Sequence, residues 1–123
     1  MKNSNKKGAT FERSIATQLT KRFGQNFSRA PNSGAFGTTH DLPHHMKAIM
    51  AGDILSPKDF RFSIECKHGY NIDFGRLLQK ASHCNIRMVW KFLEQCLTDA
   101  AVSERDPLLL YKRDRFETVA ILP

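Results

Sequence analysis

The feature that most constrains the fold is a short alternating segment at residues 60–67. Phenylalanine or isoleucine occupies every second position up to Ile64, and the positions between them are polar or charged. Because neighbouring side chains of a β-strand point to opposite faces, this pattern predicts a strand with one face in a core. The other face carries Glu65 and Lys67, which are two residues apart.

A second β-rich stretch, residues 52–55, comes just before this strand. The Ser-Pro-Lys-Asp sequence at 56–59 contains a proline and an aspartate, which suit a hairpin turn. The two stretches are therefore expected to pair as a hairpin, in which Asp53 reaches the face that carries Glu65 and Lys67.

Helical periodicity marks the N-terminal part of the chain. Apolar residues recur every four positions from Phe11 to Phe23, which predicts a helix from about Gly8 to Phe23. Gly24 is expected to end this helix. The basic residues 1–7 are expected to be flexible.

The remaining segments add helices and strands in mixed order. The predicted elements are helices at 73–83 and 89–101 and strands at 26–29, 107–111 and 116–122. A helix, three strands, a helical part and two strands in succession are typical of an α/β sandwich. We therefore expect a single α/β domain spanning residues 1–123, with a mixed central sheet of about five strands flanked by helices.

The charge and hydropathy of the chain indicate which kinds of partner it could bind. Nineteen lysines and arginines against 12 aspartates and glutamates give a formal net charge of +7, which favours a polyanion such as DNA. A basic surface without a partner is the alternative. No apolar run or signal peptide indicates a membrane or an export route, so an intracellular, cytoplasmic protein is expected. The three cysteines lack CxxC spacing and are expected to be reduced and mostly packed in the core.

Glu65, Lys67 and Asp53 could together carry chemistry. Two carboxylates and the carbonyl of Cys66 between Glu65 and Lys67 would form an all-oxygen site, which suits a hard cation such as Mg²⁺ or Mn²⁺. A lysine beside the cation could hold or help to deprotonate an attacking water. A Glu-x-Lys pair alone is weak support, because exposed faces of strands often carry such pairs; surface acids on a hairpin are the alternative.

Four motifs in order resemble those of Holliday-junction-resolvase-like members of the PD-(D/E)XK nuclease superfamily, of the small kind found in archaea and phages. They are Lys-Gly-x-x-x-Glu at 7–12, Arg-x-x-x-Ser-Gly at 29–34, Gly-Asp-Ile at 52–54 and Glu-x-Lys at 65–67. The resemblance implies a restriction-endonuclease-like core. It also implies that a helix near 90–101 and a strand near 107–110 follow the motifs, as in the phage members.

The resemblance assigns roles to these residues. Asp53 and Glu65, with the carbonyl of Cys66, would bind Mg²⁺, Lys67 would position the attacking water, and Glu12 would support the catalytic centre. Arg29 and Ser33 would contact the DNA backbone. The full set of candidate DNA-binding residues is Lys7, Arg13, Arg29, Ser33, Gly34 and His68.

The implied function is a Mg²⁺-dependent DNA endonuclease, with a branched substrate such as a four-way junction, acting in recombination or repair. Cutting two symmetric strands requires two active sites, so a homodimer is expected by symmetry. The alternatives are another PD-(D/E)XK phage nicking or repair nuclease, and a basic nucleic-acid-binding module without catalysis.

Several residues have two readings at this point. Glu12 would also suit the exposed side of its helix, and Gln95 could orient a water or a phosphate. The basic residues of 112–115 are either solvated or in contact with DNA. The aromatic residues at 90, 92, 111 and 116 are expected in the core, and platforms for base stacking are the alternative. A zinc site at His40, His44, His45 and His68 is the less favoured reading.

Overall fold

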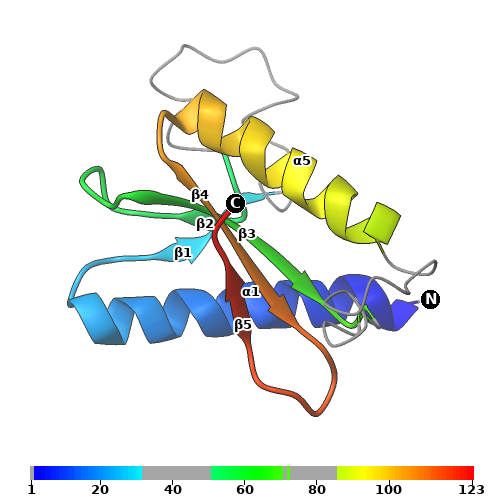
Figure 1. Cartoon of the computed structure of the whole chain (residues 1–123). Coiled ribbons are helices and arrows are strands. Elements are labelled where there is room, and N and C mark those ends of the chain that lie inside the picture. Colours follow the sequence, from blue (N-terminus) through cyan, green and yellow to red (C-terminus); the bar gives the residue numbers. More distant parts are fainter. Residues whose placement is uncertain (1, 32–50, 71, 73–85) are drawn as a thin grey trace.

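The structure is a computed structural model that describes residues 2–31, 51–70, 72 and 86–123. The described elements, in chain order, are α1 (Lys2–Phe23), β1 (Ser28–Arg29), β2 (Ile54–Leu55), β3 (Phe62–His68), α5 (Ile86–Ser103), β4 (Asp106–Lys112) and β5 (Val119–Ile121). Figure 1 shows α1 and α5 on opposite sides of the crossing strands. The chain is an α/β protein, as the order of the predicted elements indicated.

A three-stranded mixed sheet in the order β3-β4-β5 forms the centre. β3 and β4 run parallel, with Glu65 opposite Leu109 and Lys67 opposite Tyr111, and β5 pairs antiparallel with β4. Parallel neighbours need a long crossover connection, and α5 lies in this connection. The predicted strand at 60–67 is thus confirmed as β3.

Among the described elements, one helix packs against each face of this sheet. On the α1 side, a buried cluster includes Phe11, Ile15 and Ile64. On the α5 side, a second cluster includes Phe92 and Leu109. Burying apolar side chains of this size stabilises the fold by about 1.5–3 kcal/mol each, so the two helices hold β3 from both faces. The alternation of β3 consequently divides its side chains between an α1 side and an α5 side.

The first helix begins earlier than its apolar pattern indicated. α1 extends from Lys2 to Phe23 and so includes residues that we expected to be flexible. Periodicity could not reveal this first part, because its residues are polar and carry no apolar stripe. The end of the helix is as expected: Gly24 has φ of 66°, and its N–H donates to the carbonyl of Thr20.

The expected hairpin and five-stranded sheet are both corrected. β2 pairs with β1 in a separate two-stranded antiparallel sheet, with Arg29 opposite Ile54. The segment before β2 joins β3 through one backbone hydrogen bond, from the N–H of Asp53 to the carbonyl of Ile64 at 2.7 Å. Gly52 allows this approach: its φ is 85°, and a Cβ there would lie 3.0 Å from Oγ of Ser63.

Of the four aromatic residues expected in the core, two are buried and two are exposed. Phe92 and Tyr111 are buried, as expected, whereas Trp90 and Phe116 are 60% and 56% exposed. Trp90 lies on the outer face of α5, and Phe116 lies in the connection between β4 and β5. The predicted helix at 73–83 lies outside the described residues. Within the described part of the chain, no helix combines the length and apolarity needed to cross a membrane.

Candidate active site

Asp53 is held against β3 by its backbone and its side chain. It is 2% exposed, and its Oδ2 accepts a hydrogen bond of 2.7 Å from the N–H of Cys66. Its own N–H bonds to Ile64, and its carbonyl accepts the N–H of Ala30 at 2.8 Å. These contacts fix the carboxylate beside the Glu-x-Lys strand although β2 and β3 form no ladder.

Glu65 lies on the α5 side of β3 and is 1% exposed. Both of its carboxylate oxygens are buried, and neither accepts a hydrogen bond of normal geometry among the described residues. Nζ of Lys67 lies 3.0 Å from Oε1 as an ion pair. The same-face placement of these two residues is therefore confirmed. The alternative of surface acids is wrong, because Asp53 and Glu65 are among the most buried side chains of the described residues.

Lys67 is oriented by α5. Its Nζ donates to Oε1 of Gln95 at 3.1 Å and lies 4.9 Å from the centre of the Phe92 ring. The side chain is 16% exposed, so its amine lies at the boundary between the buried acids and solvent. The amine thus contacts Glu65, Gln95 and Phe92. Because these contacts already hold it in place, it loses little conformational freedom when it positions a ligand.

The acids carry more negative charge than their neighbours balance. Burial first, and then the charge of Glu65, raise the pKa of Asp53 well above its usual value, although the N–H of Cys66 lowers it. Burial raises the pKa of Glu65 to about 7, even though Lys67 lowers it. For Lys67, burial lowers the pKa, but the interactions with Glu65 outweigh burial and the net shift is upward. A bound cation would relieve this excess of negative charge.

Asp99 is a member of the site that the sequence analysis missed. It lies on α5, is 4% exposed, and raises the pKa of Glu65 through its own charge. A signal was present: the buried positions of α5 include Phe92, Cys96 and Ser103, and Asp99 falls on the same stripe. A charged residue on an otherwise inward-facing stripe indicates a polar site within the core.

The donor set fits a hard cation. Among the residues that the structure describes, no three His, Cys, Asp or Glu side chains form a group that could hold a metal ion. Two carboxylates and the backbone carbonyl of Cys66 still provide oxygen donors, which Mg²⁺ prefers in combination with water. The buried carboxylate of Glu65, which one lysine pairs with and two further acids, Asp53 and Asp99, lie near, is the observation that favours a cation here.

Comparison with known proteins identifies the family. Residues 3–123 match the family described as "Phage putative PDDEXK endonuclease". The chain belongs to this PD-(D/E)XK endonuclease family. It is also similar to Protein D14 of Escherichia phage T5, with 26% identity over 117 residues. These residues cover 92% of this chain and 66% of the phage protein, so the chain spans slightly less than two thirds of that relative. No solved structure matches the chain at a significant level.

Glu12 and Arg29 lie beside the acids. Glu12 is 4% exposed, so the reading of a solvated surface acid is wrong. Nε of Arg29, on β1, donates to Oε2 of Glu12, on α1. The charge of Glu12 contributes to the raised pKa of Asp53. The side chain of Arg29 remains 27% exposed.

The other candidate DNA-binding residues lie in different environments, and two of them lie outside the described residues. Lys7 and His68 meet at Asp114, with distances of 2.6 Å and 3.2 Å to its carboxylate oxygens. Arg13 is exposed on α1. Ser33 and Gly34 lie outside the described residues, as do the other histidines of the less favoured zinc reading, His40, His44 and His45. Cys66 and Cys96 are free and buried, as expected, and Cys84 also lies outside the described residues.

Proposed function

We propose that this chain is a Mg²⁺-dependent DNA endonuclease whose catalytic centre consists of Asp53, Glu65 and Lys67. The observation that carries the proposal is the buried carboxylate of Glu65, which lies beside a second buried carboxylate, Asp53, and an oriented lysine. Burying two acids this deeply is costly unless a function or a cation compensates. Membership of the endonuclease family supports the same chemistry.

Each residue has a defined role in this proposal. Asp53, Glu65 and the carbonyl of Cys66 hold Mg²⁺, for which Mn²⁺ could substitute. Bound there, the ion would supply positive charge for the phosphate and increase the acidity of a water. Lys67 holds the attacking water at the edge of the site, because Gln95 keeps its amine in position. Glu12 supports the centre by adding negative charge beside Asp53.

We further propose a structure-selective substrate, a four-way or otherwise branched DNA, cut by a homodimer. Two observations support this substrate: the net charge of +7 and the four motifs that resemble those of junction resolvases. Two identical centres at a fixed separation can engage two phosphates only where strands diverge suitably. The proposed DNA-binding residues are Lys7, Arg13, Arg29, Ser33, Gly34 and His68.

A cleavage assay tests the proposal. End-labelled four-way junctions, flaps, nicked duplex and plain duplex of related sequence are incubated with the protein, with Mg²⁺ or with a chelator. We expect Mg²⁺-dependent cuts in the junction at symmetric positions and little cutting of plain duplex. Glu65→Gln should be inactive, and Glu94→Gln, which changes an exposed acid on α5, should cut like the wild type.

The alternatives give different results in this assay. Preferential cutting of flaps or nicked duplex would indicate another repair or nicking nuclease of the same family and contradict the junction preference. Absence of cutting on every DNA at saturating Mg²⁺, with DNA binding intact, would indicate a binding module and contradict the proposed catalysis. Sedimentation of the free protein and of its junction complex tests the homodimer.

A further inference from the structure

We propose that the β4–β5 turn, residues 113–118, is a DNA-binding element in which the ring of Phe116 stacks on a base at the branch point. This inference rests on the proposed function, because it assigns a contact to the same DNA substrate. It concerns a part of the chain that is outside the catalytic centre. Figure 1 shows this turn extending beyond α1 at one end of the molecule.

The shape of the turn presents an aromatic ring to solvent. The N–H of Phe116 donates to the carbonyl of Arg113 at 3.0 Å, and Arg115 between them has φ of 69°. A side chain other than glycine in this left-handed region costs free energy, so the turn is held in its shape by surrounding contacts. Phe116 is 56% exposed, and the guanidinium of Arg113 lies 4.5 Å from its ring centre.

Two contacts anchor this turn beside the catalytic strand. The Asp114 carboxylate pairs with Lys7 of α1 at 2.6 Å and with His68 of β3 at 3.2 Å. His68 directly follows Lys67 in the chain. The base of the turn therefore lies at the C-terminal end of β3, on its α1 side, and DNA whose phosphate is held at Lys67 on the α5 side would pass around this end of the sheet to bring a nucleotide to the turn.

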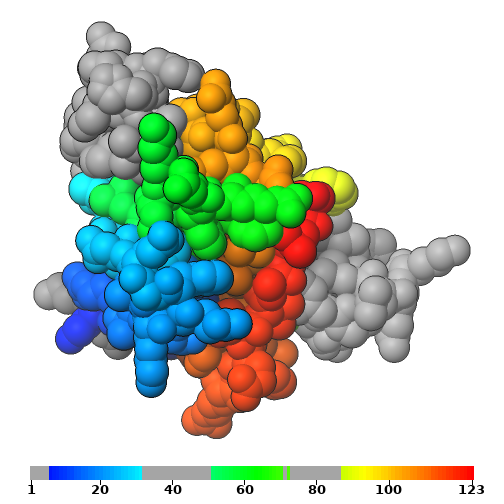
Figure 2. Space-filling model, turned by 90° about the vertical axis from the view of Figure 1, so that its left-hand side faces the viewer, coloured from blue at the N-terminus to red at the C-terminus, as the bar shows by residue number. Residues whose placement is uncertain are grey.

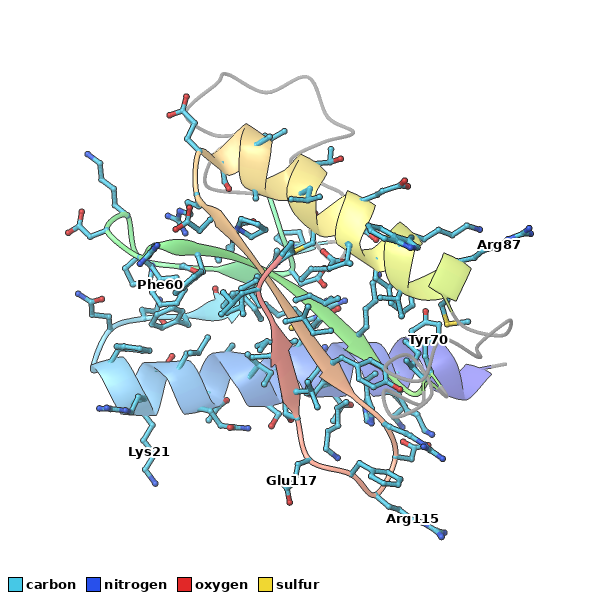
Figure 3. The ribbon with its side chains drawn as sticks, in the orientation of Figure 1. Lys21, Phe60, Tyr70, Arg87, Arg115 and Glu117 are labelled. Carbon is cyan, nitrogen blue, oxygen red and sulfur yellow. The ribbon has the colours of Figure 1, made fainter. Side chains whose placement is uncertain are left out.

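The charge of the turn suits a nucleic acid. The turn has two positive charges, on Arg113 and Arg115, and two acids, Asp114 and Glu117. The carboxylate of Asp114 already contacts Lys7 and His68. The hydrogen bond from Lys7 lowers the pKa of Asp114, so this acid stays ionised within the cluster. Figure 3 shows Arg115 extending from the end of the turn and Glu117 on its β5 side. A phosphate can therefore approach Arg115 without meeting the carboxylate of Asp114.

The combination of ring and cations selects one kind of DNA site. Arginine side chains bind phosphates on any DNA, whereas an exposed aromatic ring can stack only on a base whose stacking neighbour is absent. Such bases occur where strands diverge and are rare within a continuous duplex. Figure 2 shows the turn projecting from the lower edge of the molecule, below α1, where a strand could reach it. The turn is therefore suited to detect a branch near the cleaved phosphate.

Phe23 offers a matched control for this proposal. It is 53% exposed, and the guanidinium of Arg22 lies 5.9 Å from its ring centre. It thus repeats the exposed aromatic ring and the arginine of the β4–β5 turn, and its ring also packs against Phe27 and Phe60 at 6.0 and 5.8 Å between centroids. Along α1, it is separated from Lys7 by roughly 24 Å at 1.5 Å per residue. A general effect of losing an exposed phenylalanine should occur at both positions, but an effect of stacking should occur only at Phe116.

The experiment measures binding without cleavage, in a Glu65→Gln background. Fluorescence anisotropy gives the affinity for a four-way junction and for a linear duplex, and 2-aminopurine at the branch point reports its stacking. We expect Phe116→Ala to weaken junction binding about tenfold and to remove the 2-aminopurine change, with duplex affinity altered less than twofold. Phe116→Trp should retain junction binding, and Phe23→Ala should leave both affinities unchanged.

Three results would overturn the inference. Junction binding by Phe116→Ala equal to that of its parent would exclude stacking, and an equal loss on junction and duplex would exclude branch detection. A change in sedimentation coefficient caused by Phe116→Ala would place the ring at a protein interface instead. Thermal denaturation verifies that each variant is folded. Binding and cleavage are measured separately. A wild-type protein that does not cut DNA would therefore contradict the proposed catalysis, but the effect of Phe116→Ala on junction binding would still test the stacking.

Discussion

The N–H of Cys66 donates a 2.7 Å hydrogen bond to Oδ2 of Asp53, so the middle residue of the Glu-x-Lys strand holds the second acid of the site in place. This bond joins two segments that do not pair as strands. It also leaves the other oxygen of Asp53 for a different partner. A backbone donor is not removed by mutation of its side chain, so we expect Asp53 to keep its position after substitutions at residue 66 that preserve the strand.

Removing the charge of either acid should abolish cleavage and preserve DNA binding. Asp53→Asn and Glu65→Gln keep the size of each side chain but remove a proposed ligand of the metal ion. We expect the cleavage rate to fall by at least about a hundredfold at saturating Mg²⁺, and the affinity for DNA to change little. Single-turnover cleavage and anisotropy measure the two quantities. Near wild-type cutting by either variant would show that the proposed metal site is wrong.

Gln95 should act by positioning Lys67. Its Oε1 accepts the hydrogen bond from Nζ of Lys67, so Gln95→Ala releases the amine without removing a charge. We expect kcat to fall about tenfold or more while KM stays within about twofold. Thr98→Ala on the exposed side of α5 is the control. Equal losses in both variants, or a loss that follows thermal stability, would mean that Gln95 only supports the fold.

The stability of the metal-free protein should increase as the pH falls from 8 to 5. Burial raises the pKa of Glu65 from 4.5 to about 7 in the folded protein, and the pKa of Asp53 is also raised. The folded state therefore binds these protons more tightly than the unfolded state does. The resulting stabilisation is fully present below pH of about 4.5 and is lost as the pH rises through about 7.

Urea denaturation at several pH values measures this effect. Glu65→Gln should reduce the pH dependence, because the buried side chain then carries no charge at any pH. Saturating Mg²⁺ should reduce it as well, by stabilising the ionised form. The measurements should stay above about pH 5. The pKa of Asp114 is lowered in the folded protein, so protonation of Asp114 in more acidic solution decreases stability, whereas protonation of Glu65 increases it. A wild-type stability that is flat between pH 5 and 8 would contradict the electrostatic description of the site.

DNA binding should weaken steeply with salt. The net charge of +7 predicts that phosphate contacts dominate affinity, and each contact releases condensed counterions. The logarithm of the association constant should therefore fall linearly with the logarithm of salt concentration between about 50 and 200 mM. Base sequence should have little influence. Affinity that is constant over this range would count against binding through the DNA backbone.

The sequence by itself determined the local parts of this protein. Alternation at residues 60–67 placed Glu65 and Lys67 on one face, and the confirmed strand β3 has that arrangement. The apolar stripe predicted most of α1, and Gly24 predicted its end. These features follow from interactions between residues two to four positions apart, which a single segment encodes.

Only the tertiary structure decided which segments meet. It paired β2 with β1 and joined Asp53 to β3 by hydrogen bonds. It also brought Gln95 and Asp99 from α5 to the site, and it left Phe116 exposed. The physical reason is that periodicity defines the face of an element but not the element that covers it. Burial and the charge around each acid depend on that choice of partner.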